Sequence, residues 1–169
     1  MLVIRDARDE ELDQVADLIS DAYAQYEEGG RSPDLAKAFA EYRIEQRDVR
    51  GRLADSELIV AEADGTLVGA VTYYPPGADK SAEGWPSEYA AIRLLAVHPS
   101  ARGTGVGRAL TYESLHRARE QGSKVMALHT TTIMNVARAM YERMGFLRYP
   151  ENDFPITDDF SVMAYRLEL

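Results

Sequence analysis

Apolar residues at the start of the chain follow first a strand pattern and then a helical period. The apolar run at residues 2–4 predicts a short strand, and Asp6 or Asp9 is placed to cap the helix that follows. Apolar residues then recur at intervals of three and four positions, which puts them on one helix face: Leu12, Val15, Ala16, Ile19, Ala22, Tyr23 and Tyr26. Gly29 and Gly30 predict the end of this helix.

A second amphipathic helix is predicted from Ser32 to about Val49. Ser32 is a typical N-cap residue, and Pro33 suits the first helical position. The apolar stripe of this helix consists of Leu35, Ala38, Phe39 and Tyr42. The first third of the chain is therefore expected to contain a strand and two helices.

The apolar pattern changes to that of a sheet from Glu57. Residues 57–63 and 66–74 are separated by Asp64-Gly65, which predicts an antiparallel hairpin. Prolines and glycines at residues 75–86 then predict a loop, and loops of this length are often functional. Trp85 is expected either to pack over the sheet edge or to line a substrate pocket.

The remaining pattern alternates strands with helices. The predicted elements are a buried strand at 89–97 ending at His98-Pro99, a helix to about Gln121-Gly122, a strand at 125–128, a helix at 134–144 stopped by Gly145, and strands near 146–149 and 162–167. This order indicates an α/β protein, a mixed sheet with helices on its faces.

Composition is that of a globular protein. The 169 residues are expected to form one domain, residues 1–169. Hydrophobic residues make up 46% and charged residues 28%, which is enough to build a core. No apolar run approaches the ~20 residues of a membrane span, and the start of the chain does not resemble a signal peptide. We therefore expect a cytoplasmic protein with no membrane partner.

Charge and residue usage exclude several kinds of site. The chain has no cysteine, which excludes disulfides, thiolate metal sites and cysteine nucleophiles. His98, His116 and His129 are too far apart in sequence to suggest a metal site. The net charge of −9 disfavours nucleic acid. An anionic ligand would need a local cluster of backbone N–H groups and arginines.

Such a cluster is predicted where the buried strand gives way to a helix. Gly103, Gly105 and Gly107 leave backbone N–H groups uncovered at the helix start, and Arg102 and Arg108 add positive charge. The spacing fits neither the dinucleotide fingerprint nor the nucleoside-triphosphate loop. A turn that serves chain geometry alone is the alternative to an anion site.

Two motifs resemble the GCN5-related N-acetyltransferase family. Residues 102–107, Arg-Gly-Thr-Gly-Val-Gly, match its Q/R-x-x-G-x-G/A signature, and residues 94–99 precede them as its fourth strand does. Residues 135–146 look like its Asn-x-x-Ala-x-x-x-Tyr-Glu-x-x-Gly-Phe segment. The resemblance implies the acyl-CoA N-acyltransferase fold: a mostly antiparallel central sheet with splayed strands 4 and 5, flanked by about four helices.

The resemblance also implies residue roles. Acetyl-CoA would lie in the cleft between the splayed strands, with its pyrophosphate on the glycine-rich turn. A backbone N–H near Val97 would bind the thioester oxygen, and Tyr141 would be the catalytic acid that protonates the departing thiolate. The implied cofactor-binding residues are Leu95, Ala96, Val97, Arg102, Gly103, Thr104, Gly105, Val106, Gly107, Arg108 and Asn135.

The general base is not specified by the motifs. Family members often place Glu or His on the fourth strand, where this chain has Ala91 and Arg93. The remaining candidates are Glu88, Tyr89, His129 and a water chain. Arg93 is expected either to bind a carboxylate of the acceptor or to pair with a nearby acid.

These inferences predict an acetyl-CoA-dependent N-acetyltransferase acting on a small amine or amino-acid-like acceptor, with no metal. A peptide or protein acceptor and a non-catalytic acyl-CoA sensor are the alternatives. A homodimer is expected from the frequency of two-fold oligomers and the habit of the family. The acidic pairs Glu27-Glu28 and Asp158-Asp159 are expected to lie on the solvated surface.

Overall fold

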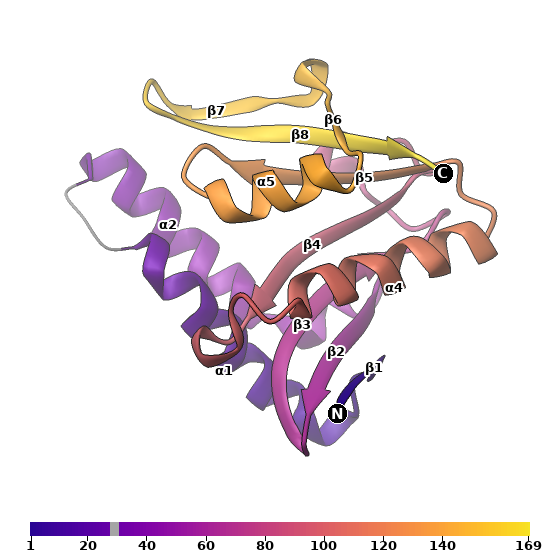
Figure 1. Ribbon diagram of the computed structural model, residues 1–169. Coiled ribbons are helices and arrows are strands. Elements are labelled where there is room, and N and C mark those ends of the chain that lie inside the picture. Colours follow the sequence, from indigo (N-terminus) through magenta and orange to yellow (C-terminus); the bar gives the residue numbers. More distant parts are fainter. Residues whose placement is uncertain (28–30) are drawn as a thin grey trace.

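The computed structural model describes residues 1–27 and 31–169 (Figure 1). Within these residues eight strands form one mixed sheet, in the order β1-β2-β3-β4-β5-β8-β6, with β7 paired to β8. The strands are β1 Leu2–Asp6, β2 Glu57–Ala63, β3 Thr66–Tyr74, β4 Ala90–Val97, β5 Val125–Thr131, β6 Leu147–Arg148, β7 Phe154–Thr157 and β8 Phe160–Glu168. The helices are α1 Leu12–Tyr23, α2 Pro33–Arg47, α3 Val49–Arg52, α4 Val106–Glu120 and α5 Asn135–Arg143.

Helices cover both faces of the sheet (Figure 1). On one face, buried residues of α4 and α5 such as Leu110 and Tyr141 pack with Val71 of β3. On the other face, Ile19 of α1 packs with Val60 of β2. Helix α2 packs on α1 and approaches β7 instead of lying flat on the sheet. The predicted mixed sheet with helices on its faces is confirmed.

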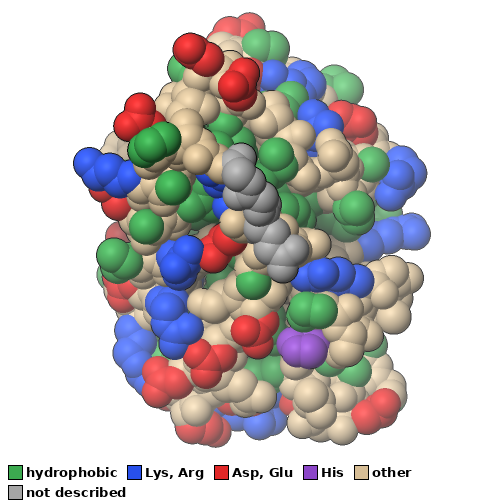
Figure 2. All heavy atoms as spheres, turned by 90° about the vertical axis from the view of Figure 1, so that its left-hand side faces the viewer, with side chains coloured by type: hydrophobic (Ala, Val, Ile, Leu, Met, Phe, Trp, Pro, Cys, Tyr) green, Lys and Arg blue, Asp and Glu red, His purple; other side chains and the backbone are tan. Residues whose placement is uncertain are grey.

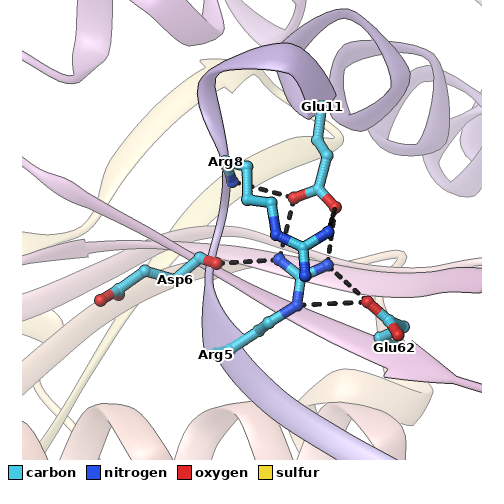
Figure 3. A network of polar contacts seen from close by, with 5 residues as sticks. All are labelled: Arg5, Asp6, Arg8, Glu11 and Glu62. Carbon is cyan, nitrogen blue, oxygen red and sulfur yellow. Dashed lines mark hydrogen bonds and ion pairs between the residues drawn. The ribbon is translucent and has the colours of Figure 1, made fainter. Parts of the chain in front are cut away.

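An arginine network fixes the junction between β1 and α1 (Figure 3). Nη2 of Arg5 lies 2.6 Å from Glu11 and 2.5 Å from Glu62 on β2. The Glu11 carboxylate also accepts a hydrogen bond of 2.8 Å from the backbone N–H of Arg8. The predicted cap at Asp6 or Asp9 is wrong, because Glu11 accepts the cap hydrogen bond and Asp6 accepts from Arg117 on α4 instead.

The second helix begins as predicted but ends earlier. The Ser32 hydroxyl accepts from the Leu35 N–H at 3.3 Å, with Pro33 at the first helical position. Asp48 leaves the helical conformation and caps the short helix α3 by accepting from the Gly51 N–H. The helix end predicted at Gly29 and Gly30 lies outside the described residues.

Strand β4 contains a bulge and then separates from β5. Thr72 of β3 pairs with Arg93 but Ala70 pairs with Ala96, so β4 has one extra residue there, and Leu94 adopts a left-handed φ of 52°. Parallel pairing of β4 with β5 spans only 90–92 of β4. The predicted splay of these neighbouring strands is confirmed.

The C-terminal strands differ from their predicted pattern. Strand β7 was not predicted, because Pro155 interrupts a short run that becomes an edge strand only by pairing with β8. Asp158 and Asp159 form the exposed turn of this hairpin, as expected of surface residues. No helix in residues 1–27 or 31–169 is long and apolar enough to cross a membrane.

Candidate active site

The glycine-rich turn forms an open cradle of backbone N–H groups at the start of α4. Gly103 and Gly105 have left-handed φ angles of 75° and 91°, and a Cβ on either would meet nothing within 4 Å. The N–H groups of residues 103–108 donate to no other described residue. Free N–H groups together with the positive end of a helix dipole favour a bound anion. The structure therefore favours the predicted anion site over a turn that serves chain geometry alone.

Two arginines stand beside this cradle. Arg102 is exposed and donates to the Ala22 carbonyl at the end of α1 at 3.1 Å. Arg108 is also exposed and lies over the ring of Tyr112 at 5.3 Å. The Thr104 hydroxyl donates to the Ala101 carbonyl at 2.6 Å. The cradle therefore combines N–H groups that have no partner among the described residues with two exposed arginines.

The cradle lies beside the splayed edge of β4. A Cβ on Gly107 would be in ordinary contact with this strand, 3.4 Å from Val97 and 3.8 Å from Leu95. Beyond Ile92 no described strand pairs with the β4 edge that faces β5. Ala96 pairs with β3 on the opposite edge. The backbone at Leu95 to Val97 therefore borders the cleft in which the resemblance puts the pantetheine arm.

Helix α5 closes this cleft from one side. Tyr141 is 5% exposed and packs edge-to-face on Phe146 at 5.5 Å. Burial raises the pKa of the Tyr141 phenol well above its ordinary value, so the phenol keeps its proton at neutral pH. Asn135 lies exposed at the first position of α5, where its side-chain oxygen accepts from Arg138 at 2.6 Å.

A cavity of about 490 Å³ lies on the opposite face of the sheet, between α2, the β7–β8 hairpin and the splay. Figure 2 shows hydrophobic side chains interspersed with charged ones on the side of the molecule where α2 lies. The apolar stripe of α2 lines this cavity, and its residue Tyr42 also packs against the core beneath α1. The apolar lining includes Leu35, Ala38, Phe39, Met134, Phe154, Ile156, Phe160 and Val162. Leu94 of β4 and Thr130 of β5 also line it, so the cavity reaches the splayed strands.

Charged residues form a cluster on the cavity wall. Arg93 Nη2 lies 2.6 Å from Glu45 of α2, and Arg93 Nε pairs with Glu83 from the loop before β4. The exposed fractions of the side chains are 21% for Arg93, 15% for Glu83 and 46% for Glu45. Burial alone would lower the pKa of Arg93, but Glu83 and Glu45 overcome this and raise it. Arg93 is expected from the sequence either to bind a carboxylate of the acceptor or to pair with a nearby acid, and the structure shows it paired with two acids.

His129 lies next to this cluster. Its Nε2 is 2.9 Å from the Asn152 carbonyl, which can only accept, so Nε2 carries the proton and Nδ1 keeps a lone pair in the neutral ring. Nδ1 is buried, lies 3.7 Å from Glu83 and has no hydrogen-bond partner among the described residues. Trp85 stacks on the imidazole with ring centres 4.8 Å apart. Trp85 is thus buried behind the cavity wall and does not line the cavity.

The other candidate bases lie elsewhere. Glu88 is exposed, and the Tyr89 hydroxyl is 3.5 Å from Arg166. Neither residue lines the cavity, because both precede β4 at the end where it pairs with β5. Glu27 lines the cavity and pairs with Arg43 at 2.8 Å, whereas Glu28 lies outside the described residues.

The sequence did not identify Glu83 and Glu45. Glu83 lies in a loop whose prolines and glycines carry no motif, and Glu45 is one of several charged residues on α2. The fold alone brings both carboxylates to Arg93. No group of three or more acidic or histidine residues with metal-binding geometry occurs in the part of the chain that the structure describes.

Comparisons with known proteins agree with this geometry. The model of the acetyltransferase (GNAT) family matches residues 12–146. A mycothiol acetyltransferase from Cellulomonas flavigena is 36% identical over 124 residues, 67% of this chain and 35% of that protein. The PaiA N-acetyltransferase from Thermoplasma acidophilum, solved in complex with coenzyme A, has a TM-score of 0.76 at 16% identity, over 100% of this chain and 99% of that chain. YncA from Salmonella typhimurium, solved with acetyl-CoA, has a TM-score of 0.65 at 19% identity, over 99% and 94%.

These likenesses differ in what they show. The solved structures confirm the acyl-CoA N-acyltransferase fold, in which the sheet of this chain opens between β4 and β5. The chain spans about a third of the length of the curated relatives that it matches, 35% and 38% for two of them. The family model covers most of the chain, including the glycine-rich cradle and Tyr141. The chain therefore belongs to the acetyltransferase (GNAT) family.

Proposed function

We propose that this chain transfers an acetyl group from acetyl-CoA to the amine of a small molecule. The observation that carries the proposal is the order of three features along the chain: the N–H cradle at 103–108, the stretch of β4 that pairs with no strand on its β5 side, and Leu94 of β4 in the cavity lining. A donor with an anionic end and an extended arm fits this arrangement. Family membership and the coenzyme A complexes of proteins with the same fold support the same ligand.

Different residues of the chain contact different parts of acetyl-CoA. The pyrophosphate is held by the backbone N–H groups of Gly103, Thr104, Gly105, Val106, Gly107 and Arg108. The side chains of Arg102 and Arg108 add positive charge. The backbone of Leu95, Ala96 and Val97 borders the pantetheine arm, and Asn135 contacts it from α5. Bound acetyl-CoA supplies an acetyl group activated as a thioester.

Acid and base groups flank the opening between the strands. Tyr141 donates its proton to the leaving thiolate, since burial keeps the phenol protonated. On the cavity side, Glu83 and His129 form the pair that accepts the proton from the acceptor ammonium. Both residues line the cavity, and Nδ1 of His129 lies 3.7 Å from a carboxylate oxygen of Glu83. A backbone N–H near Val97 stabilises the developing oxyanion.

The cavity favours a small molecule over a protein terminus. It is walled by α2 on one side and by the β7–β8 hairpin on the other, and its volume of about 490 Å³ is in the range typical of small-molecule sites. A non-catalytic acyl-CoA sensor would not need the Glu83–His129 pair or Tyr141 for proton transfer. Turnover is therefore the property that distinguishes an enzyme from a sensor.

Release of coenzyme A thiol across a panel of amines tests the proposal. The chain has no cysteine, so a thiol reagent detects only released coenzyme A. Arg108→Ala in the first turn of α4 is expected to weaken acetyl-CoA binding about tenfold, because it removes a charge from the cradle. Arg119→Ala in the last turn of the same helix makes the same change away from the cradle and is the matched control. Equal effects of the two variants, or no binding by the unmodified protein, would contradict the proposal.

A further inference from the structure

The arginine on the cavity wall, Arg93, already forms ion pairs with two glutamates. Arg93 is the only arginine or lysine among the described residues that line the cavity. It faces two carboxylates, Glu45 and Glu83, so with His129 neutral this cluster has a net charge of −1. A ligand ammonium group complements such a cluster, whereas a ligand carboxylate adds to its negative charge.

A carboxylate on the acceptor would also have to displace a resident partner. Glu83 is 15% exposed and would be left partly buried without its guanidinium, which is costly. Glu45 is 46% exposed, but it reaches Arg93 across the cavity from α2, so its displacement would disturb the apolar wall. Arg93 is therefore a positioning residue for Glu83 and Glu45 and does not bind the acceptor.

The rest of the wall is apolar and partly open. Phe39 of α2 meets Phe160 of β8 edge-to-face at 5.4 Å. Phe154 and Ile156 of β7 line the same space and are 42% and 38% exposed. Aromatic and branched side chains that remain uncovered favour an apolar body, and the volume has room for a ring with a short chain.

We propose that the acceptor is a primary amine on an apolar, ring-sized body with no carboxylate beside the amine. This inference rests on the proposed function and names its acceptor class. In the reaction a nitrogen–carbon bond forms and the carbon–sulfur bond of the thioester breaks. The Glu83–His129 pair takes a proton from the acceptor ammonium and releases it to solvent. The thiolate takes a proton from Tyr141, and the second proton that the nitrogen loses restores the Tyr141 phenol. The products are an N-acetyl amine and coenzyme A.

Phenethylamine and phenylalanine provide the test, because they differ only by the carboxylate. The expected kcat/KM for phenethylamine exceeds that for phenylalanine by at least about tenfold. It also exceeds that for ethylamine, which lacks the apolar body. Glu45→Gln removes one carboxylate from Arg93 and is expected to reduce the preference for phenethylamine over phenylalanine several-fold. Glu10→Gln, at an exposed position outside the cavity lining, removes the same charge and should leave the preference unchanged.

Fluorescence of Trp85 gives a second readout that does not need turnover. The only tryptophan stacks on His129 at 4.8 Å, so an occupied cavity should change its emission. Neither ligand absorbs at the red edge of tryptophan absorption. Phenethylamine is expected to change the emission at a lower concentration than phenylalanine does.

The outcomes separate the two proposals. Binding of phenethylamine over phenylalanine without any thiol release would overturn the proposed activity and support the inference about the cavity. Acetylation of phenylalanine as fast as phenethylamine would overturn the inference and support the activity. Acetylation of some other amine, with no response of Trp85 to phenethylamine, would also overturn the inference. An unchanged preference in Glu45→Gln would refute the role given to Arg93.

Discussion

Two arginines of this protein are each held by two glutamates, with opposite surroundings. Arg5 binds Glu11 and Glu62 where β1, β2 and the start of α1 meet (Figure 3). Arg93 binds Glu45 and Glu83 across the wall of a cavity. The two arginine side chains have nearly the same exposed fraction, 19% and 21%. The same chemistry therefore fastens a junction in one place and sets the charge of a binding site in the other.

The difference lies in the elements that supply the glutamates. Glu62 is on a strand directly paired with β1, and Glu11 also caps the chain through the Arg8 N–H. Glu45 and Glu83 come from a helix and from the loop before β4, both line the cavity, and both pair with Arg93. An ion cluster that ties two paired strands to the start of a helix has a structural role, and one that lines a cavity is available to a ligand.

The largest expected effect is on turnover. Glu83→Gln is expected to lower kcat about 100-fold, because the cavity loses the carboxylate that accepts the ammonium proton. Its melting temperature should stay close to that of the unmodified protein. Glu62→Gln makes the same change at Arg5 and should lower the melting temperature while leaving kcat unchanged. Steady-state kinetics and thermal unfolding of both variants measure this split, and a comparable loss of kcat in Glu62→Gln would abolish the distinction between the two clusters.

The second effect is on the free energy of unfolding, where the Arg5 cluster matters more than the Arg93 cluster. Arg5→Met leaves Glu11 and Glu62 together without a cation and is expected to lower the free energy of unfolding by about 3 kcal/mol. Arg93→Met should cost less, about 2 kcal/mol, since it leaves Glu83 partly buried without a cation but Glu45 is half exposed and can turn to water. Urea unfolding of the two variants at neutral pH measures the difference. Equal losses would show that the cavity cluster also supports the fold.

The sequence predicts one of these regions better than the other for a physical reason. The β2–β3 hairpin depends on a local Asp-Gly turn, and the cradle depends on glycines two residues apart, so both can be found from neighbouring residues. The cavity joins Phe39, Glu83 and His129 from three elements that are far apart in the chain. Only the completed fold brings these three residues together, so no local sequence pattern predicts the cavity.

Helix α2 shows why the pattern of apolar residues is insufficient. Its stripe, which includes Phe39 and Tyr42, is expected to lie on the buried face of an amphipathic helix. Both residues are only partly buried and line the cavity. Apolar side chains that face a core and apolar side chains that face a ligand have the same period, so the sequence places the helix but not the space beneath it.

The smallest expected effect distinguishes the Arg5 cluster by pH. Hydrogen bonding to Arg5 lowers the pKa of Glu11 from 4.5 to about 2, against an opposing effect of burial, and the Arg8 N–H lowers it further. A carboxyl whose pKa is lowered by folding adds stability above its unfolded pKa and loses this contribution as the pH falls. Glu11→Gln keeps an oxygen for the Arg8 N–H but removes the charge. The difference in unfolding free energy between the unmodified protein and Glu11→Gln should be constant above about pH 5 and shrink steadily between pH 4.5 and 2.

Urea unfolding at a series of pH values measures this difference, with Glu10→Gln as the matched control on the neighbouring exposed carboxylate. The control is expected to show a smaller difference at every pH, because Glu10 forms no ion pair with any described residue. A Glu11→Gln difference that does not change between pH 5 and 2 would mean that the charge of Glu11 does not stabilise the junction. The cluster at Arg5 would then stabilise the fold through packing and neutral hydrogen bonds, and charge would matter only at Arg93, where it faces the cavity.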